Sequence, residues 1–234
     1  MKRNPDDLSF LDHYEELRRR IIKCLCAILI GACCFYAFLD PVLAFLIKPV
    51  GRLVFVAPGE AFVVRIMLSV FGGAFFALPV ILYHIWRFVI AGLKREEIKY
   101  VRIFAPFSFF LFIAGGLVAY FIAVPIAIRF LLNFSTETIV PMITVKNYIS
   151  FVGTMLLAFG LIFELPLAVM FLAKIGVITP IFLERNRRQA IVIILIVSAV
   201  LTPPDVITQL IMAGPLIILY EIGIWAARCA CPKR

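Results

Sequence analysis

Charged residues are scarce in this 234-residue chain: they make up 16% of it, whereas 64% is hydrophobic and the mean hydropathy is +1.07. A soluble domain usually carries about 25% charged residues, because its surface has to meet water. The shortage excludes soluble globular, disordered and fibrous proteins and leaves a polytopic membrane protein. Six helices of about 20 residues would occupy about 120 positions, which leaves loops and short tails but no separate catalytic domain.

Motifs of catalysis are also missing. The chain has no phosphate-binding glycine loop ending in Lys-Ser or Lys-Thr, no His-Glu-x-x-His and no Gly-x-Ser-x-Gly. Its two histidines, His13 and His84, have no evident nucleophile beside them. We therefore expect neither an enzyme nor a bound cofactor.

The six cysteines do not suggest a disulfide framework. Cys33 and Cys34 lie inside an apolar run, and the other four flank membrane segments near the two ends of the chain: Cys24, Cys26, Cys229 and Cys231. A framework would place cysteines in exposed loops on an oxidising side, so we expect reduced thiols. A metal site built from the four flanking cysteines is an alternative that we disfavour, and no metal is expected.

Long apolar runs alternate with polar segments along the whole chain, and no internal repeat is visible. They predict an all-α integral membrane protein in which one domain, 1–234, contains six transmembrane helices. These spans cover about 21–39, 66–86, 103–128, 148–173, 189–201 and 206–227.

Positive charge is distributed unevenly between the loops. With six spans, 18 of the 23 lysines and arginines fall on the side of both termini. Lysine and arginine accumulate in cytoplasmic loops, so both termini are predicted to be cytoplasmic. The net charge of +9 is therefore explained as a topology signal and not as a nucleic-acid-binding surface.

The last two spans are expected to be short. Between Arg188 and Pro203 lie 14 residues, about 21 Å of helix, whereas the hydrocarbon core of a bilayer is about 30 Å thick. Either the membrane thins there or a neighbouring helix covers the shortfall. This edge is a candidate docking site for another membrane protein.

Acidic residues on the basic cytoplasmic side need an explanation. Glu15 and Glu16 stand four residues before Arg19 and Arg20, so simple pairing along one helix is the favoured interpretation by spacing alone. The pair 96–97 begins a helix, where the helix dipole favours carboxylates. The alternative is that Glu16 and Glu97, held apart at one membrane surface, bind a ligand with two cationic groups, for which arginine is the preferred partner.

Two polar positions lie within or beside the apolar spans. Glu164 is about 6 Å from the bilayer centre, and such a costly group should face a cavity, a partner or a pathway; Pro166 is expected to kink its helix.

Thr202, Pro203 and Asp205 form a helix start in which Asp205 has a mainly architectural role. With Gln209 one turn further on, Thr202 forms a polar spot that suggests hydrogen bonds to a partner helix.

From the residues alone, a secondary transporter with Glu164 as an intramembrane ion or proton site is as well supported as a receptor. A transporter of that kind should show broken helices in two related halves. The sequence predicts a break only at Glu164–Pro166, with no counterpart in the first half.

Five motifs in order along the chain favour the receptor. Together they resemble one family, TatC, the multispanning subunit of the twin-arginine protein translocase. The matching stretches are LDHYEELR (11–18), ALPVILY (77–83), FGLIFELP (159–166), LTPPDV (201–206) and YEIG (220–223).

The resemblance implies a fold and a function. The fold is a concave, glove-like bundle with short fifth and sixth helices in the prokaryotic cytoplasmic (inner) membrane. The function is that of a receptor for twin-arginine signal peptides of folded proteins, which self-associates and works with single-span TatA- and TatB-type subunits in export driven by the proton-motive force. The implied site residues are Glu16, Arg18, Phe88 and Glu97 for the signal peptide, Glu164 on the concave face, Thr202 and Gln209 for partner docking, and Pro49, Tyr120 and Asp205 for structure and translocation.

Overall fold

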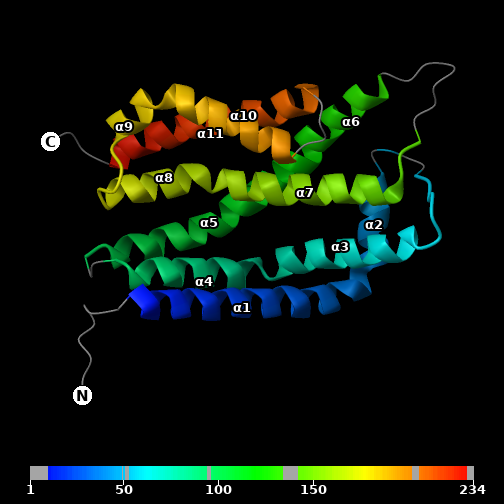
Figure 1. The fold of residues 1–234 in the computed structure, drawn as a ribbon, viewed down its shortest axis with the longest axis horizontal. Coiled ribbons are helices and arrows are strands. Elements are labelled where there is room, and N and C mark those ends of the chain that lie inside the picture. Colours follow the sequence, from blue (N-terminus) through cyan, green and yellow to red (C-terminus); the bar gives the residue numbers. More distant parts are fainter. Residues whose placement is uncertain are drawn as a thin grey trace.

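The computed structural model describes residues 10–48, 50, 53–93, 96–133, 142–201 and 206–230. This part of the chain is helical and contains no strand, apart from one isolated bridge between Val54 and Thr144, so the predicted all-α class is confirmed (Figure 1). In chain order the elements are α1 (Phe10–Phe35), the 3₁₀ turn η1 (Tyr36–Phe38), α2 (Leu39–Ile47), α3 (Glu60–Phe76), α4 (Leu78–Ala91), α5 (Ile98–Val118), the π-helical turn η2 (Ala119–Ala123), α6 (Val124–Leu132), α7 (Val145–Phe163), α8 (Leu165–Lys174), α9 (Pro180–Arg185), α10 (Arg187–Leu201) and α11 (Val206–Ala230).

The helices form layers around α7 and α8, which lie in the middle of Figure 1. Helix α1 packs on α3, both α3 and α5 pack on α7, and α11 packs on α8. The core lies along α7, where Ile149, Val152, Met155 and Phe159 are almost fully buried. Figure 1 also shows that α1 begins, α4 ends, α5 begins and α11 ends at one end of the bundle, which we call the terminal end.

Close helix contacts depend on glycine at two crossings. A Cβ on Gly73 of α3 would lie 2.4 Å from the backbone nitrogen of Ala32 in α1, and a Cβ on Gly115 of α5 would lie 2.4 Å from the Phe159 carbonyl oxygen in α7. Small residues let helix backbones approach in this way, which is how helices associate in an apolar medium.

Apolar helices long enough to cross a membrane number four in the described residues: Tyr14–Ile47, Ile98–Leu132, Val145–Lys174 and Thr208–Ala230. The bent pair α3–α4 is a fifth candidate. Helix α10 has only 15 residues, about 22 Å, as the short fifth span predicts. The sixth helix is not short: α11 has 25 residues, and its apolar part, Thr208–Ala230, is long enough to cross a membrane.

The predicted second span, 66–86, is not one helix. Helices α3 and α4 are bent by 54° at Ala77, and Pro79 at the start of α4 has no N–H to continue the hydrogen-bond ladder. Because α7 and α8 also separate at Glu164, the chain has a helix break in each half. The prediction of a single break was therefore wrong, and helix breaks do not argue against a transporter.

The end of the bundle opposite the terminal end is held together by hydrogen bonds between segments distant in sequence. The Glu60 carboxylate, 7% exposed, accepts the backbone N–H of Val56 at 2.8 Å and that of Lys146 at 3.0 Å. The hydroxyls of Tyr120 and Tyr148 donate to carbonyl oxygens in the last turn of α2, where a helix leaves its acceptors unused. The start of α3, the start of α7 and helix α2 are thus joined.

Candidate functional site

The four residues expected to bind the signal peptide lie at the terminal end. Glu16 and Arg18 are in the first turns of α1, Phe88 is in the last turn of α4, and Glu97 directly precedes α5, and these helix ends meet at one end of the bundle (Figure 1). Arg18 is exposed, whereas Glu16, Phe88 and Glu97 are half-buried. Glu96 is exposed, so the more enclosed of the two adjacent carboxylates is Glu97.

The pairing predicted along α1 is present. Arg19 pairs with Glu15 at 3.5 Å, and Arg20 pairs with Glu16 through two guanidinium nitrogens, Nε and Nη2. Because each carboxylate already has a cation four residues on, spacing along the helix accounts for both pairs. Glu16, the carboxylate expected to bind a ligand, is therefore already paired with Arg20.

Glu164 lies at the junction of α7 and α8, where the helix axis is interrupted. Its Oε2 accepts a hydrogen bond from the Ser108 hydroxyl of α5 at 2.6 Å, and Ser108 is 2% exposed. Its Oε1 is buried and has no hydrogen-bond partner in the described part of the chain. A buried acceptor without a partner is costly, so Glu164 retains an acceptor for a group that enters from outside.

A half-open, mostly apolar cavity of about 630 Å³ adjoins Glu164. Its wall runs from Gly92 and Leu93, in the segment between α4 and α5, past Trp86 to Ser108 and Glu164. The cavity therefore connects the segment that precedes Glu97 with the carboxylate inside the bundle. An extended or helical apolar ligand fits this chemistry, because apolar pockets with a few polar groups orient their ligands through those groups.

Tyr120 borders a second, apolar concavity of about 390 Å³ between α2, α3, α5 and α7. Its ring stacks on Phe45 at a centroid distance of 4.9 Å, and its hydroxyl donates to the Phe45 carbonyl oxygen at 2.9 Å. These contacts anchor α2 to the turn η2. Pro49, the other position expected to matter there, lies outside the described residues.

The edge formed by α10 and α11 carries exposed apolar side chains, among them Val192, Ile196, Val200, Leu210, Ile218 and Trp225. Gln209 is half-buried, and its amide donates to the Leu195 carbonyl oxygen of α10 at 3.0 Å. The amide nitrogen therefore joins the two helices of this edge, in addition to any contact with a partner. Thr202 and Asp205 lie outside the described residues.

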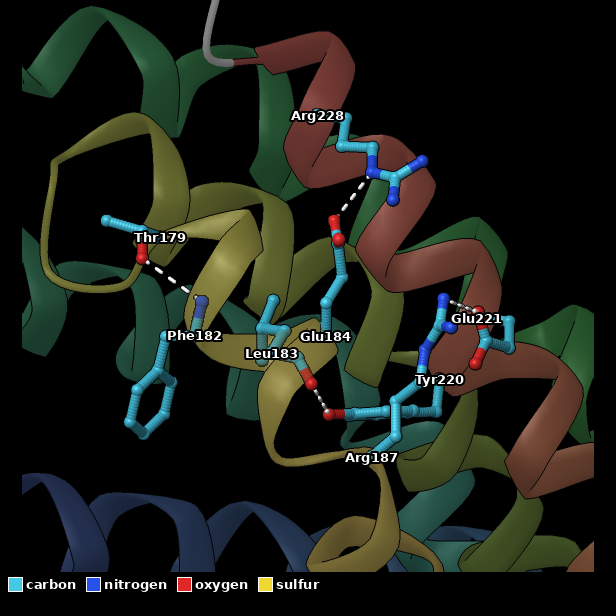
Figure 2. Close-up of polar contacts among 8 residues, drawn as sticks. All are labelled: Thr179, Phe182, Leu183, Glu184, Arg187, Tyr220, Glu221 and Arg228. Carbon is cyan, nitrogen blue, oxygen red and sulfur yellow. Dashed lines mark hydrogen bonds and ion pairs between the residues drawn. The ribbon is translucent and has the colours of Figure 1, made fainter.

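Polar contacts attach α9 and the start of α10 to α11 (Figure 2). Arg228 donates to Glu184 at 2.7 Å, Arg187 to Glu221 at 2.9 Å, and the Tyr220 hydroxyl to the Leu183 carbonyl oxygen at 2.9 Å. The hydrogen bond from Arg228 lowers the pKa of the Glu184 carboxyl. We call these three contacts the α9–α11 clamp; they hold α9 and the start of α10 against α11.

Within the described residues no group of histidine, cysteine and acidic side chains could hold a metal ion, and the cysteines there are free thiols. Cys231, one member of the disfavoured metal site, lies outside this part.

Several residues of these sites were not predicted from the sequence. Ser108 is a lone hydroxyl in an apolar helix and was detectable on that ground. Glu60 is an acid at a helix start, which the helix dipole explains without any tertiary role. Glu184 and Arg228 are separated by 44 residues and carry no local signal.

Comparison with known proteins identifies the family. The family model described as Sec-independent protein translocase protein (TatC) matches residues 12–215. The TatC proteins of Carboxydothermus hydrogenoformans and Desulforapulum autotrophicum are 43% and 40% identical to this chain; the alignments cover 97% and 100% of it and 95% and 89% of those proteins. A crystal structure of the twin-arginine translocase receptor TatC, 38% identical, superposes with a TM-score of 0.86 over 93% of this chain and 99% of that one. The chain belongs to the TatC family of Sec-independent protein translocase proteins.

Proposed function

We propose that this protein is the receptor of a twin-arginine translocase, and that Glu16, Arg18, Phe88 and Glu97 form its site for the two arginines of a signal peptide. As a TatC protein, the chain is a membrane-embedded, non-enzymatic component of a protein translocase. The observation that carries the proposal is the cavity from the segment before Glu97 to Glu164. Arginines held at the terminal end would place the following apolar part of a signal peptide at its mouth.

Glu164 is the polar end of this path in our proposal. Its open Oε1 offers an acceptor to a polar group of the peptide or of a partner helix. The alternative of a secondary transporter with Glu164 as its ion site keeps one observation in its favour, the helix break in each half of the chain. Membership of a protein translocase family outweighs that observation.

Binding of a peptide with two adjacent arginines tests the site. Photocrosslinking of such a peptide to the purified protein should be abolished in Glu97→Ala and reduced in Glu16→Ala, because each change removes a carboxylate that pairs with a guanidinium. Glu96→Ala and Glu15→Ala are matched controls, since both residues are exposed neighbours of the proposed ligands. Undiminished crosslinking in the Glu16→Ala, Glu97→Ala double variant would refute the assignment.

We further propose six membrane spans with both termini in the cytoplasm, in a concave bundle whose short α10 crosses a locally thinned bilayer. The terminal end then faces the cytoplasm. A variant in which Cys229, an exposed thiol near the end of α11, is the sole cysteine tests this topology. A membrane-impermeant maleimide should label it in inverted vesicles and not in intact cells, and the reverse pattern would refute the orientation.

The α10–α11 edge is proposed to dock single-span TatA- and TatB-type subunits through its exposed apolar face, with Thr202 and Gln209 as polar contacts. Gln209→Leu should reduce co-purification of a TatB-type subunit, and Gln189→Leu, at an exposed position of α10, should leave it unchanged. Equal recovery with both variants would exclude Gln209 from the docking surface. We also propose that transport is driven by the proton-motive force, as the resemblance to the TatC family implies.

A further inference from the structure

Two consecutive ion pairs on α1 have the same composition and spacing but different surroundings. Glu15 and Arg19 have side chains that are 68% and 76% exposed, and their closest atoms are 3.5 Å apart. Glu16 and Arg20 have side chains that are 32% and 15% exposed. The first pair is an ordinary surface pair, whereas Arg20 is largely withdrawn from water.

Arg20 is held from two sides. Its Nε donates to Glu16 Oε1 at 3.1 Å, and Nη2 donates to the same oxygen. Its Nη1 lies 3.4 Å from the His84 carbonyl oxygen of α4, so the guanidinium lies between α1 and α4. The guanidinium is a rigid planar fork, so an arginine loses little side-chain entropy for each hydrogen bond that it forms. The contacts with Glu16 and with the His84 carbonyl therefore keep Arg20 beside Glu16.

Both hydrogen bonds from Arg20 to Glu16 end on one carboxylate oxygen, Oε1. Oε2 of Glu16 has no partner in the part of the chain that the structure describes. The site consequently offers an incoming cation one open oxygen, on a carboxylate whose charge is already balanced. An incoming cation can still donate a hydrogen bond to Oε2 of Glu16, but its long-range electrostatic attraction to this carboxylate is weakened by the charge of Arg20.

We propose, on the basis of the proposed function, that Arg20 is a resident cation that makes the Glu16 site selective for guanidinium over ammonium groups. A lysine ammonium is a compact, strongly hydrated point charge and depends on net attraction to displace its water. A guanidinium can still direct two N–H donors to the single open oxygen, as Arg20 does with Nε and Nη2 on Oε1, and these directional bonds do not depend on net charge alone. Neutralisation by Arg20 thus weakens lysine binding more than arginine binding, which is selectivity through a repulsive element.

Arg20→Gln tests this role with two synthetic peptides, one with adjacent arginines ahead of an apolar segment and the same peptide with two lysines. Removing the resident charge should tighten the Kd of the lysine peptide by about tenfold and that of the arginine peptide by about threefold. Arg20→Lys keeps the charge and should retain wild-type selectivity within about twofold. Arg19→Gln, the matched control on the exposed pair, should leave both Kd values within about twofold of wild type.

Other outcomes overturn the proposal. Weaker binding of the arginine peptide to Arg20→Gln would make Arg20 a support for Glu16, and equal or absent changes for both peptides would remove its part in selectivity. Glu16→Gln separates this failure from failure of the proposed function. If Glu16→Gln binds the arginine peptide as tightly as wild type, the assignment of Glu16 itself is wrong; if it binds weakly while Arg20→Gln behaves as wild type, only the role of Arg20 is wrong. A thermal unfolding profile like that of wild type shows that each variant is folded.

Discussion

Glu60 and Glu164 are two carboxylates withdrawn from water in different regions, and their hydrogen bonding is opposite. Glu60, opposite the terminal end, has each oxygen on a backbone N–H, one from Val56 and one from Lys146. Glu164, inside the bundle, has one oxygen on Ser108 and the other without a partner among the described residues, beside a cavity of about 630 Å³.

The difference separates a structural carboxylate from one available to a ligand. Glu60 joins two segments of the chain and has its hydrogen-bonding capacity used by rigid backbone donors, so a ligand gains little there. Glu164 retains an open acceptor at a position where an unmade hydrogen bond is costly. Burial of an acid alone therefore does not mark a functional site, whereas burial with an unused oxygen at a cavity does.

The largest effect on stability is expected for Glu60→Ala. Two backbone N–H groups would lose their acceptor at a site with little access for water, so Tm of the detergent-purified protein should fall by about 5 °C or more. Glu96→Ala removes an exposed carboxylate just before α5 and should leave Tm unchanged. An unchanged Tm in Glu60→Ala would show that water replaces the carboxylate. Glu60 would then not be a structural carboxylate that differs in role from Glu164.

Glu164→Gln is expected to change Tm by less than about 2 °C, because glutamine keeps an acceptor for the Ser108 hydroxyl and costs less to withdraw from water than a charge. Export of a folded reporter should nevertheless fall by about tenfold or more, since glutamine places an N–H₂ donor where the open acceptor was. Ser108→Ala serves as the control that removes the internal hydrogen bond and leaves the carboxylate. Wild-type export by Glu164→Gln would contradict a role for the open oxygen.

The smallest effect on Tm is expected for Glu184→Gln, because the ion pair of Glu184 with Arg228 is partly exposed. Since its pKa in the folded state is lowered, its contribution to stability is present above the unfolded pKa of about 4.3 and is lost as pH falls through the folded pKa. The small Tm advantage of wild type over Glu184→Gln at pH 7 should therefore shrink progressively as thermal unfolding is measured at pH values below about 4.3. Glu15→Gln, on the exposed pair, should differ little from wild type throughout. A difference between wild type and Glu184→Gln that does not shrink as the pH falls would contradict this origin.

Much of the architecture was predictable because apolar length and proline act locally. The fifth span was predicted to begin at residue 189, and α10 begins at 187. The predicted fourth span, 148–173, lies within α7 and α8. The pairing of Glu16 with Arg20 followed from spacing of four residues on one helix. The bend at Ala77 was missed because Pro79 follows the break without interrupting the apolar pattern from which the span was predicted.

The sequence alone determined that the chain is helical and apolar enough for a membrane, and its motifs indicated the family, since composition, helix periodicity and motifs can all be read along the chain. Only the tertiary structure decided which carboxylates have their oxygens occupied. Ser108 and Glu164 are 56 residues apart, and Glu60 and Lys146 are 86 apart. Contacts at such separations depend on how the helices pack, because hydrogen bonding is directional and short in range. Packing also withdrew Arg20 from water and left Arg19 exposed, although both arginines have the same local sequence relation to an acid.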